Sequence, residues 1–229
     1  MSVKLYELAG ADSNRRFSPY CWRVKYALAH KGITPEPHII RFTEKSAIVH
    51  SGSPTVPVID DGDISVSDSF EIAKYLDNAY PNAPTLMGSD IAIGQARFIE
   101  SWANTQIMAV IFRMIILDIF EGLDEGDKDY FRETREKRIA RKLEEFQKYD
   151  DEQIQILFNN LTPVRMMLST QPFISGEEPG YADYILMGCF MFARASSTKK
   201  FLKDDDSVNE WYEKMLDMYD GLGRRVKVS

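Results

Sequence analysis

The sequence predicts an α/β domain followed by an all-α domain. In the first eighty or so residues, short strand-like segments alternate with helical ones, which is the order of a sheet covered by helices. The segment Tyr80-Pro81-Asn82-Ala83-Pro84 then breaks the pattern and is typical of a linker. Nearly everything after Ser89 has helical periodicity. We therefore expect one domain over residues 1–82 and a second over residues 89–229.

The first domain begins with a strand, a helix and a second strand. Residues 4–8 have a short strand pattern, and a polar loop leads from them to Pro19. Proline suits the first position of a helix, because that position needs no backbone N–H. The predicted helix ends near Lys31-Gly32, where a basic residue is followed by a capping glycine. Residues 35–41 follow as the second strand.

The rest of this domain contains a hairpin and a closing helix. Residues 44–51 form a weak, polar helical turn. Residues 56–60 and 64–67 flank Asp61-Gly62, which is a strong hairpin signal. Residues 69–80 have the pattern of an amphipathic helix. This order predicts a four-stranded mixed sheet with helices packed on it.

The second domain is predicted to hold about five helices. One long helix covers residues 91–121, and four more cover 128–148, 151–168, 182–195 and 207–219. Pro163 is expected to kink or split the third of these. The mixed charges of residues 132–142 indicate a solvated helix face.

Composition excludes several classes of function. The net charge is −7 and no basic stripe is present, so nucleic acid and anionic membranes are poor partners. A small anionic ligand stays compatible, because a local site can be positive on an acidic protein. Two cysteines and three scattered histidines form neither a disulfide framework nor a metal motif. The apolar run at residues 107–120 is interpreted as too short and too charged to span a bilayer, and no signal peptide is evident. We expect a cytoplasmic protein with reduced thiols.

Ser18 stands where the first helix is predicted to begin. The free N–H groups and partial positive charge of a helix N-terminus stabilise an anion, including a thiolate. A hydroxyl there can donate a hydrogen bond to a thiolate, or it can simply cap the helix. The sequence alone leaves both roles open. Cys21, one turn inside the helix, and Cys189, in an apolar helix, are both expected to be buried.

Two further positions could hold a peptide-like ligand. A cis bond at Val56-Pro57 would leave the Val56 N–H and C=O free to pair with a ligand backbone, and an edge-strand proline is the alternative. Asp68-Ser69 begins the next helix. Its N–H groups suit a carboxylate and the Asp68 side chain suits an ammonium, while either residue can also cap the helix.

Together these features resemble the glutathione transferases. Their first domain has a thioredoxin-like fold, and the related glutaredoxins carry Cys-Pro-Tyr-Cys where this chain has Ser18-Pro19-Tyr20-Cys21. The resemblance implies that Ser18 stabilises the thiolate of bound glutathione and takes no part in disulfide exchange. It implies that Val56 pairs with the cysteinyl backbone beside a cis Pro57, and that Asp68 and Ser69 hold the γ-glutamyl end. Relatives of this kind are usually homodimers.

One branch of the superfamily is especially similar. Residues 18–32, 68–77, 182–184 and 220–224 resemble the bacterial lignin β-etherases and their fungal relatives. This resemblance implies that the glutathione thiolate attacks a hydrophobic aromatic substrate and displaces a phenoxide from a β-aryl ether. The alternatives are a ligandin-like protein that binds phenolic compounds with little turnover, and an interaction module that has lost its site.

The chain departs from its relatives at Thr55, where many of them have a lysine before the Val-Pro pair. If that lysine holds the glycyl carboxylate of glutathione, another cation must do so here. Arg41 and Lys45 are the candidates by position, and each could equally be a solvated surface residue. Asp183 is expected to have a folding role, because it can fold back on the Gly180 N–H as in a capping box.

The acceptor site is expected between the domains, by resemblance. It would be lined by the loop that ends at Phe17 and by the long helix of the second domain. Asn104 and Met108 are four residues apart and share a helix face. Asn104 could bind a phenolic ligand beside an apolar wall, or could face water. Gln106 points away from that face and is expected to be solvated.

Overall fold

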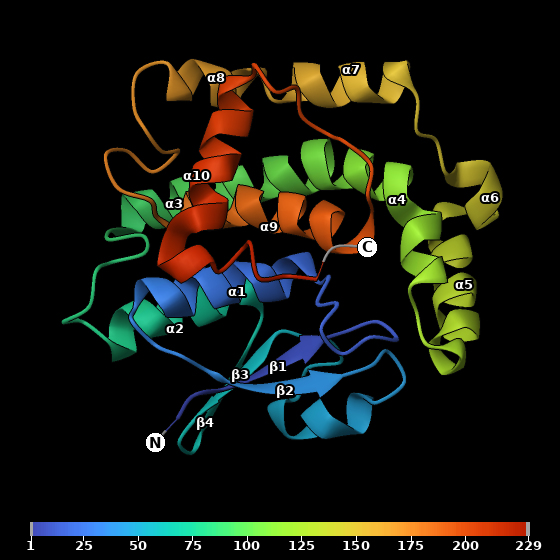
Figure 1. The fold of residues 1–229 in the computed structure, drawn as a ribbon. Helices are drawn as coiled ribbons and strands as arrows, with labels where there is room; N and C mark the ends of the chain where they lie inside the picture. The colour runs from blue at the N-terminus through green and yellow to red at the C-terminus, as the bar shows by residue number, and fades with distance from the viewer. Residues whose placement is uncertain (1, 228–229) are drawn as a thin grey trace.

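The computed structural model describes residues 2–227 and contains the predicted mixed sheet. Strand β1 (Lys4–Leu8) pairs in parallel with β2 (Glu36–Ile40) and antiparallel with β3 (Val58–Asp61). Strand β4 (Ile64–Ser67) pairs antiparallel with β3, so the strand order is β2-β1-β3-β4. The predicted fold class, an α/β domain followed by a helical domain, is confirmed (Figure 1).

Helices cover both faces of this sheet. Helix α1 (Pro19–His30) and helix α2 (Ser69–Ala79) lie between the sheet and the second domain (Figure 1). On the other face, the 3-10 helix η1 (Lys45–Ser51) packs Ile48 against Ile40 and Val58 in a small apolar cluster. Burial against both faces explains why the short strands are stable despite having only four or five residues each.

The long predicted helix is continuous but contains a change of pitch. Helix α3 (Asp90–Trp102) passes into a π-helical segment, η2 (Ala103–Met108), and then into α4 (Ala109–Glu121). The whole segment, Asp90–Glu121, is long and apolar enough to cross a membrane by length and composition alone, which contradicts the expectation that residues 107–120 are too short and too charged. In the fold, 44% of its most apolar window is buried, and core helices of soluble proteins pass the same test.

Two of the four remaining predicted helices are each divided into two, and the other two extend slightly beyond their predicted ends. The observed helices are α5 (Glu125–Ile139), α6 (Leu143–Phe146), α7 (Asp151–Asn160), α8 (Thr162–Leu168), α9 (Tyr181–Ser196) and α10 (Ser207–Gly221). The single helix predicted over 128–148 is wrong, because Ala140 adopts a left-handed backbone conformation (φ 54°) that ends α5. Pro163 stands at the start of α8, so the predicted segment 151–168 is split.

The two domains meet where α1 packs on α9 (Figure 1). Gly188 in α9 permits this approach. A Cβ atom at that position would lie 2.6 Å from the Pro19 carbonyl oxygen and 2.9 Å from Cγ of Arg23. The close contact fixes the start of α1, and therefore Ser18, relative to the second domain.

Asp183 organises the start of α9 from a fully buried position. Its carboxylate accepts hydrogen bonds from the backbone N–H groups of Ile174 (2.8 Å), Ser175 (3.0 Å) and Gly180 (3.1 Å), and from Nε1 of Trp211 (2.9 Å). The folding role and the contact with Gly180 are as predicted. A buried carboxylate with four donors ties the preceding loop, α9 and α10 into one unit.

Replacing Asp183 with alanine should therefore destabilise the protein by about 3 kcal/mol or more, because several buried donors lose their acceptor. Urea unfolding followed by circular dichroism measures this change. Asp204→Ala, at an exposed carboxylate that pairs with Lys200, should change the free energy of unfolding by less than about 0.5 kcal/mol. A loss below about 1 kcal/mol for Asp183→Ala would contradict the assigned role.

Candidate functional site

A cavity of about 590 Å³ opens where the two domains meet. This volume is within the range of small-molecule sites. Eight of the eleven predicted site residues line it: Phe17, Ser18, Arg41, Lys45, Thr55, Val56, Asn104 and Met108. Pro57, Asp68 and Ser69 are not among the lining residues. Residues predicted for the glutathione site and residues predicted for the acceptor site thus line the same cavity.

Ser18 caps α1 and faces this cavity. Its Oγ accepts the Cys21 backbone N–H at 3.3 Å, so the capping role is present. The side chain is largely buried, with 6% of the residue exposed. Apart from a side-chain contact with the buried Cys21 thiol, no hydrogen bond of residues 2–227 uses the Ser18 hydroxyl proton. The capping contact uses a lone pair of Ser18 Oγ as the acceptor and does not use the hydroxyl proton. Ser18 can therefore cap the helix and still donate a hydrogen bond to a ligand in the cavity.

Cys21 cannot supply the reactive thiol. It is 1% exposed, and burial raises the pKa of its thiol to about 12. Burial also raises the pKa of the Cys189 thiol. Both cysteines are buried, as predicted. Any thiolate at the start of α1 must therefore belong to a bound ligand. Within the described chain, no group of three His, Cys, Asp or Glu side chains could hold a metal ion.

The Val56-Pro57 bond is cis, as expected from the resemblance. Pro57 is buried behind the cavity, while Val56 lines it. In the part of the chain that the structure describes, no hydrogen bond uses the Val56 N–H or C=O. This backbone edge can therefore accept and donate to an extended peptide, in the manner of an added strand.

Asp68 and Ser69 begin α2 beside the cavity lining but outside it. Asp68 has φ 72°, and its Oδ1 accepts from the N–H groups of Phe70 (2.9 Å) and Glu71 (3.1 Å), so it caps the helix. Its side chain is exposed. Ser69 is buried, with 1% of the residue exposed, so its hydroxyl is not presented at the surface of this structure.

The basic residues near Thr55 differ in their partners. Nη1 of Arg41 lies 2.6 Å from the carboxylate of Asp124, so its charge is already paired. Nζ of Lys45 donates to the Tyr130 hydroxyl at 2.7 Å, and no carboxylate forms an ion pair with it among the described residues. Of the two predicted cations, Lys45 has the charge available for an incoming carboxylate.

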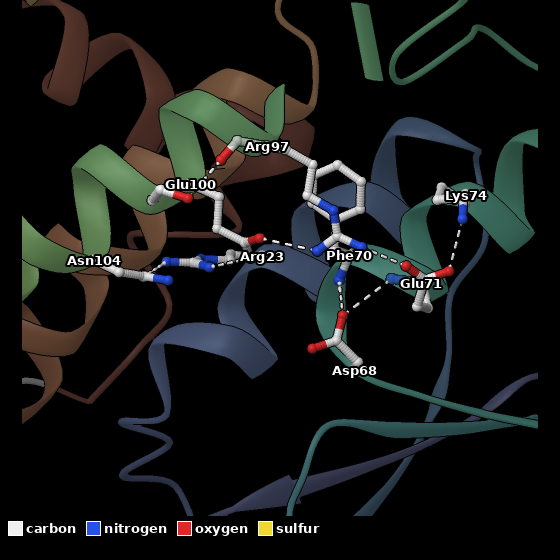
Figure 2. Close-up of polar contacts among 9 residues, drawn as sticks. Arg23, Asp68, Phe70, Glu71, Lys74, Arg97, Glu100 and Asn104 are labelled. Carbon is white, nitrogen blue, oxygen red and sulfur yellow. Dashed lines mark hydrogen bonds and ion pairs between the residues drawn. The ribbon is translucent and has the colours of Figure 1, made fainter. Parts of the chain in front are cut away.

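A polar network connects the cavity to the start of α2 (Figure 2). The fully buried Arg23 donates to Oδ1 of Asn104 (2.7 Å) and to Glu100 (3.0 Å). Arg97 pairs with Glu100 (3.2 Å) and also with Glu71 of α2. Opposite charges alternate along this path, so the two domains are held together electrostatically.

Asn104 is held on the cavity side of the π-helical segment by this contact with Arg23. Its carbonyl oxygen is occupied, and its NH₂ group remains as a donor beside the apolar wall that includes Met108. Gln106 is exposed, as predicted. The pocket-facing alternative for Asn104 is therefore the one that the structure favours.

The opposite wall of the cavity was not predicted from the sequence. Rings line it, from Phe42, Phe112, Tyr130, Phe131, Phe146 and Phe192. Arg135 and Arg138 line it as well. The assignment of residues 132–142 to a solvated face is wrong for Arg135, which is half-buried, whereas Arg138 is exposed as well as lining the cavity. Arg135 and Arg138 are three residues apart and therefore lie on one face of α5. This spacing is the sequence signal that could have indicated a shared site.

Comparisons with known proteins agree with this architecture. A glutathione transferase from Phanerochaete chrysosporium, GSTFuA3, has a TM-score of 0.79 at 20% identity, covering 100% of this chain and 98% of that one. A glutathione S-transferase of Ceriporiopsis subvermispora, solved in complex with glutathione, has a TM-score of 0.80 at 21% identity, covering 100% and 99%. At these identities the likeness concerns the fold.

Sequence relatives match shorter stretches. Glutathione S-transferase U13 of Arabidopsis thaliana is 31% identical over 102 residues, which are 41% of this chain and 44% of that protein. A glutathione S-transferase-like protein of Aspergillus flavus, ustS, is 26% identical over 138 residues, which are 54% and 48%. The chain thus matches about half the length of these curated relatives.

Family profiles cover most of the chain. Residues 13–84 match the glutathione S-transferase N-terminal domain, and residues 95–219 match the C-terminal domain. Together with the sheet order, the cis Val56-Pro57 bond and Ser18 at the start of α1, these matches show that the chain belongs to the glutathione S-transferase family.

Proposed function

We propose that this protein is a glutathione transferase in which the Ser18 hydroxyl stabilises the thiolate of bound glutathione. One observation carries the proposal. Ser18 lies at the N-terminus of α1, faces the cavity and has a hydroxyl proton that its capping contact does not use. Across the same cavity lining, the unpaired Val56 backbone can hold the cysteinyl part of a peptide.

The chemistry follows from the position of the helix. A hydrogen bond to the charged form of a thiol, together with the helix N-terminus, lowers its pKa from about 8.5. The thiol proton passes to solvent. The sulfur lone pair then forms a C–S bond to an electrophilic carbon, and the leaving group departs with the electrons of the bond that breaks. In a β-aryl ether the leaving group would be a phenoxide, which takes a proton from water.

Glutathione would span the first domain. The Val56 backbone would pair with the cysteinyl unit next to Pro57, and the exposed Asp68 carboxylate would take the γ-glutamyl ammonium at the N-terminus of α2. Ser69 would contribute through its backbone N–H, since its hydroxyl is buried. Lys45 would take the glycyl carboxylate, with Arg41 and Thr55 beside it.

The likeness to fungal transferases supports this proposal. One Ceriporiopsis neighbour, whose match covers the whole of this chain, was solved in complex with glutathione. Cleavage of lignin-derived β-aryl ethers, a homodimeric assembly and a cytoplasmic location belong to the same proposal. They rest on the resemblance of Ser18-Pro19-Tyr20-Cys21-Trp22 and of residues 220–224 to the β-etherase branch.

A second function, sequestration of phenolic compounds with little turnover, is favoured by the ring-lined wall of the cavity. Titration of a phenolic ligand, combined with assay of a β-aryl ether in the presence of glutathione, separates the two functions. Tight binding without product would support sequestration.

Replacing Ser18 with alanine should raise the thiol pKa of the enzyme–glutathione complex by about one unit or more, because the hydrogen bond favours the charged form. Below the wild-type pKa, the rate should then fall about tenfold for each unit of the shift. The pH dependence of kcat with 1-chloro-2,4-dinitrobenzene measures this. Ser13→Ala, in the exposed preceding loop, should keep the wild-type profile. An unchanged profile for Ser18→Ala would remove Ser18 from the mechanism.

Replacing Lys45 with methionine should raise KM for glutathione about tenfold or more, because a hydrogen bond to a charged group is lost. The rate at saturating glutathione should change little, since Lys45 is assigned to binding. Initial rates over a glutathione series give both quantities. Lys200→Met, at an exposed second-domain lysine, is the matched control. If KM stays unchanged in Lys45→Met, the glycyl carboxylate is held elsewhere.

Replacing Ser18 with cysteine should create thiol–disulfide exchange activity, because a thiol at a helix N-terminus is readily ionised. The measurement is release of glutathione from a glutathionylated peptide. Ser13→Cys supplies a cysteine in the exposed loop and should remain far slower. Equal rates for the two variants would contradict the placement of Ser18 beside the glutathione sulfur.

A further inference from the structure

The cavity is positive on a protein whose net charge is −7. Four cationic side chains line it, Arg41, Lys45, Arg135 and Arg138, of which Arg41 is paired with Asp124 outside the lining. None of the described lining residues is an aspartate or a glutamate. A binding site with this imbalance attracts anions, and its low-dielectric walls strengthen the attraction.

Two of these cations belong to the second domain and stand among aromatic rings. The guanidinium carbon of Arg135 lies 4.9 Å from the ring centre of Phe42 and 4.7 Å from that of Phe131. That of Arg138 lies 5.1 Å from the ring centre of Phe112. These cation–π contacts hold the two guanidinium groups at the ring-lined wall, where an aromatic ligand would pack.

The charges of Arg135 and Arg138 have no acidic partner among the described residues. Arg132, one turn earlier on α5, shows the ordinary arrangement, with ion pairs to Glu136 (2.9 Å) and Glu144 (2.8 Å). Arg135 instead donates to Oγ1 of Thr134 (2.9 Å). Burial and the neighbouring charge of Arg138 lower the pKa of the Arg135 guanidinium. Two neighbouring cations are thus held at an apolar wall without compensation from the protein.

We infer that the second substrate is an anionic aromatic compound, whose ring packs on the phenylalanine side chains and whose carboxylate or sulfonate lies between Arg135 and Arg138. Planar guanidinium groups match such anions geometrically and supply several donors. The inference rests on the proposed function for its link to catalysis, but the preference for an anion is a property of the cavity alone. The inference narrows the class of second substrate from hydrophobic aromatic compounds in general to aromatic compounds that carry a negative group.

A matched pair of fluorescent probes tests this preference without turnover. The dyes 8-anilinonaphthalene-1-sulfonate and N-phenyl-1-naphthylamine share the same ring system and differ by the sulfonate. Fluorescence titration of the full chain gives Kd for each dye. We compare the Kd of the neutral dye, divided by the Kd of the anionic dye, between variants. This ratio should fall about tenfold or more in Arg135→Gln/Arg138→Gln, because hydrogen bonds to the sulfonate are lost. Saturating glutathione should leave the preference in place, since its carboxylates are assigned to other residues.

The control is Lys137→Gln/Arg141→Gln, which removes the same charge from exposed positions that do not line the cavity. Its ratio should stay within about twofold of wild type. A similar fall in both double variants would overturn the inference, because the effect would then be one of net charge. An unchanged Kd ratio in Arg135→Gln/Arg138→Gln, the cavity variant, would overturn the inference as well. Arg138 is exposed, so Arg138→Gln alone should fold normally and show part of the fall if the double variant does not fold.

Turnover provides a separate measurement. With glutathione, 4-chloro-3,5-dinitrobenzoate should be favoured over its methyl ester in wild type and lose that advantage in the cavity variant, each rate being corrected for the uncatalysed reaction. Chloride leaves as the C–S bond forms, and the carboxylate is unchanged. Absence of activity toward 1-chloro-2,4-dinitrobenzene would count against the proposed function, whereas a dye ratio that stays unchanged in Arg135→Gln/Arg138→Gln counts only against the anionic acceptor.

Discussion

The buried guanidinium of Arg23 is the interaction on which the rest of the arrangement depends. Arg23 belongs to α1, yet the partners that neutralise and orient it, Glu100 and Asn104, belong to the second domain (Figure 2). An unpaired charge in this position would cost about 3–5 kcal/mol, so α1 and the long helix must meet in this register. Because Ser18 caps the same helix, the contact also fixes Ser18 relative to the ring-lined wall of the cavity. Gly188 makes the approach sterically possible.

The cavity is a consequence of that docking. The first domain contributes a helix N-terminus and an unpaired backbone edge at Val56, and the second contributes rings and two guanidinium groups. Neither domain holds a complete site. The division suits the proposed two-substrate reaction, because a peptide-like substrate and an aromatic substrate would meet only where the domains do. It also explains how an acidic protein can hold a positive site, since the neutralising carboxylates, such as those paired with Arg132, lie outside the cavity.

The sequence predicts the fold well because its signals are local. Pro19, Asp61-Gly62 and the Asp68 cap each act within a few residues, and the structure follows them. The break at Ala140 could not be predicted, because alanine has no intrinsic preference for the left-handed conformation that it adopts there. The ring-lined wall with Arg135 and Arg138 was missed because its signal depends on tertiary structure. The pattern of a charged helix such as α5 indicates a solvated face until the tertiary structure shows which of its faces meets the other domain.

The mechanism requires glutathione to bind with its sulfur beside the Ser18 hydroxyl while its backbone pairs with Val56. A crystal structure of the protein soaked with glutathione measures this directly. We expect the sulfur to lie within hydrogen-bonding distance of Ser18 Oγ and both backbone groups of Val56 to bond to the cysteinyl unit. A sulfur placed away from Ser18, or a tripeptide that leaves Val56 unpaired, would contradict the mechanism.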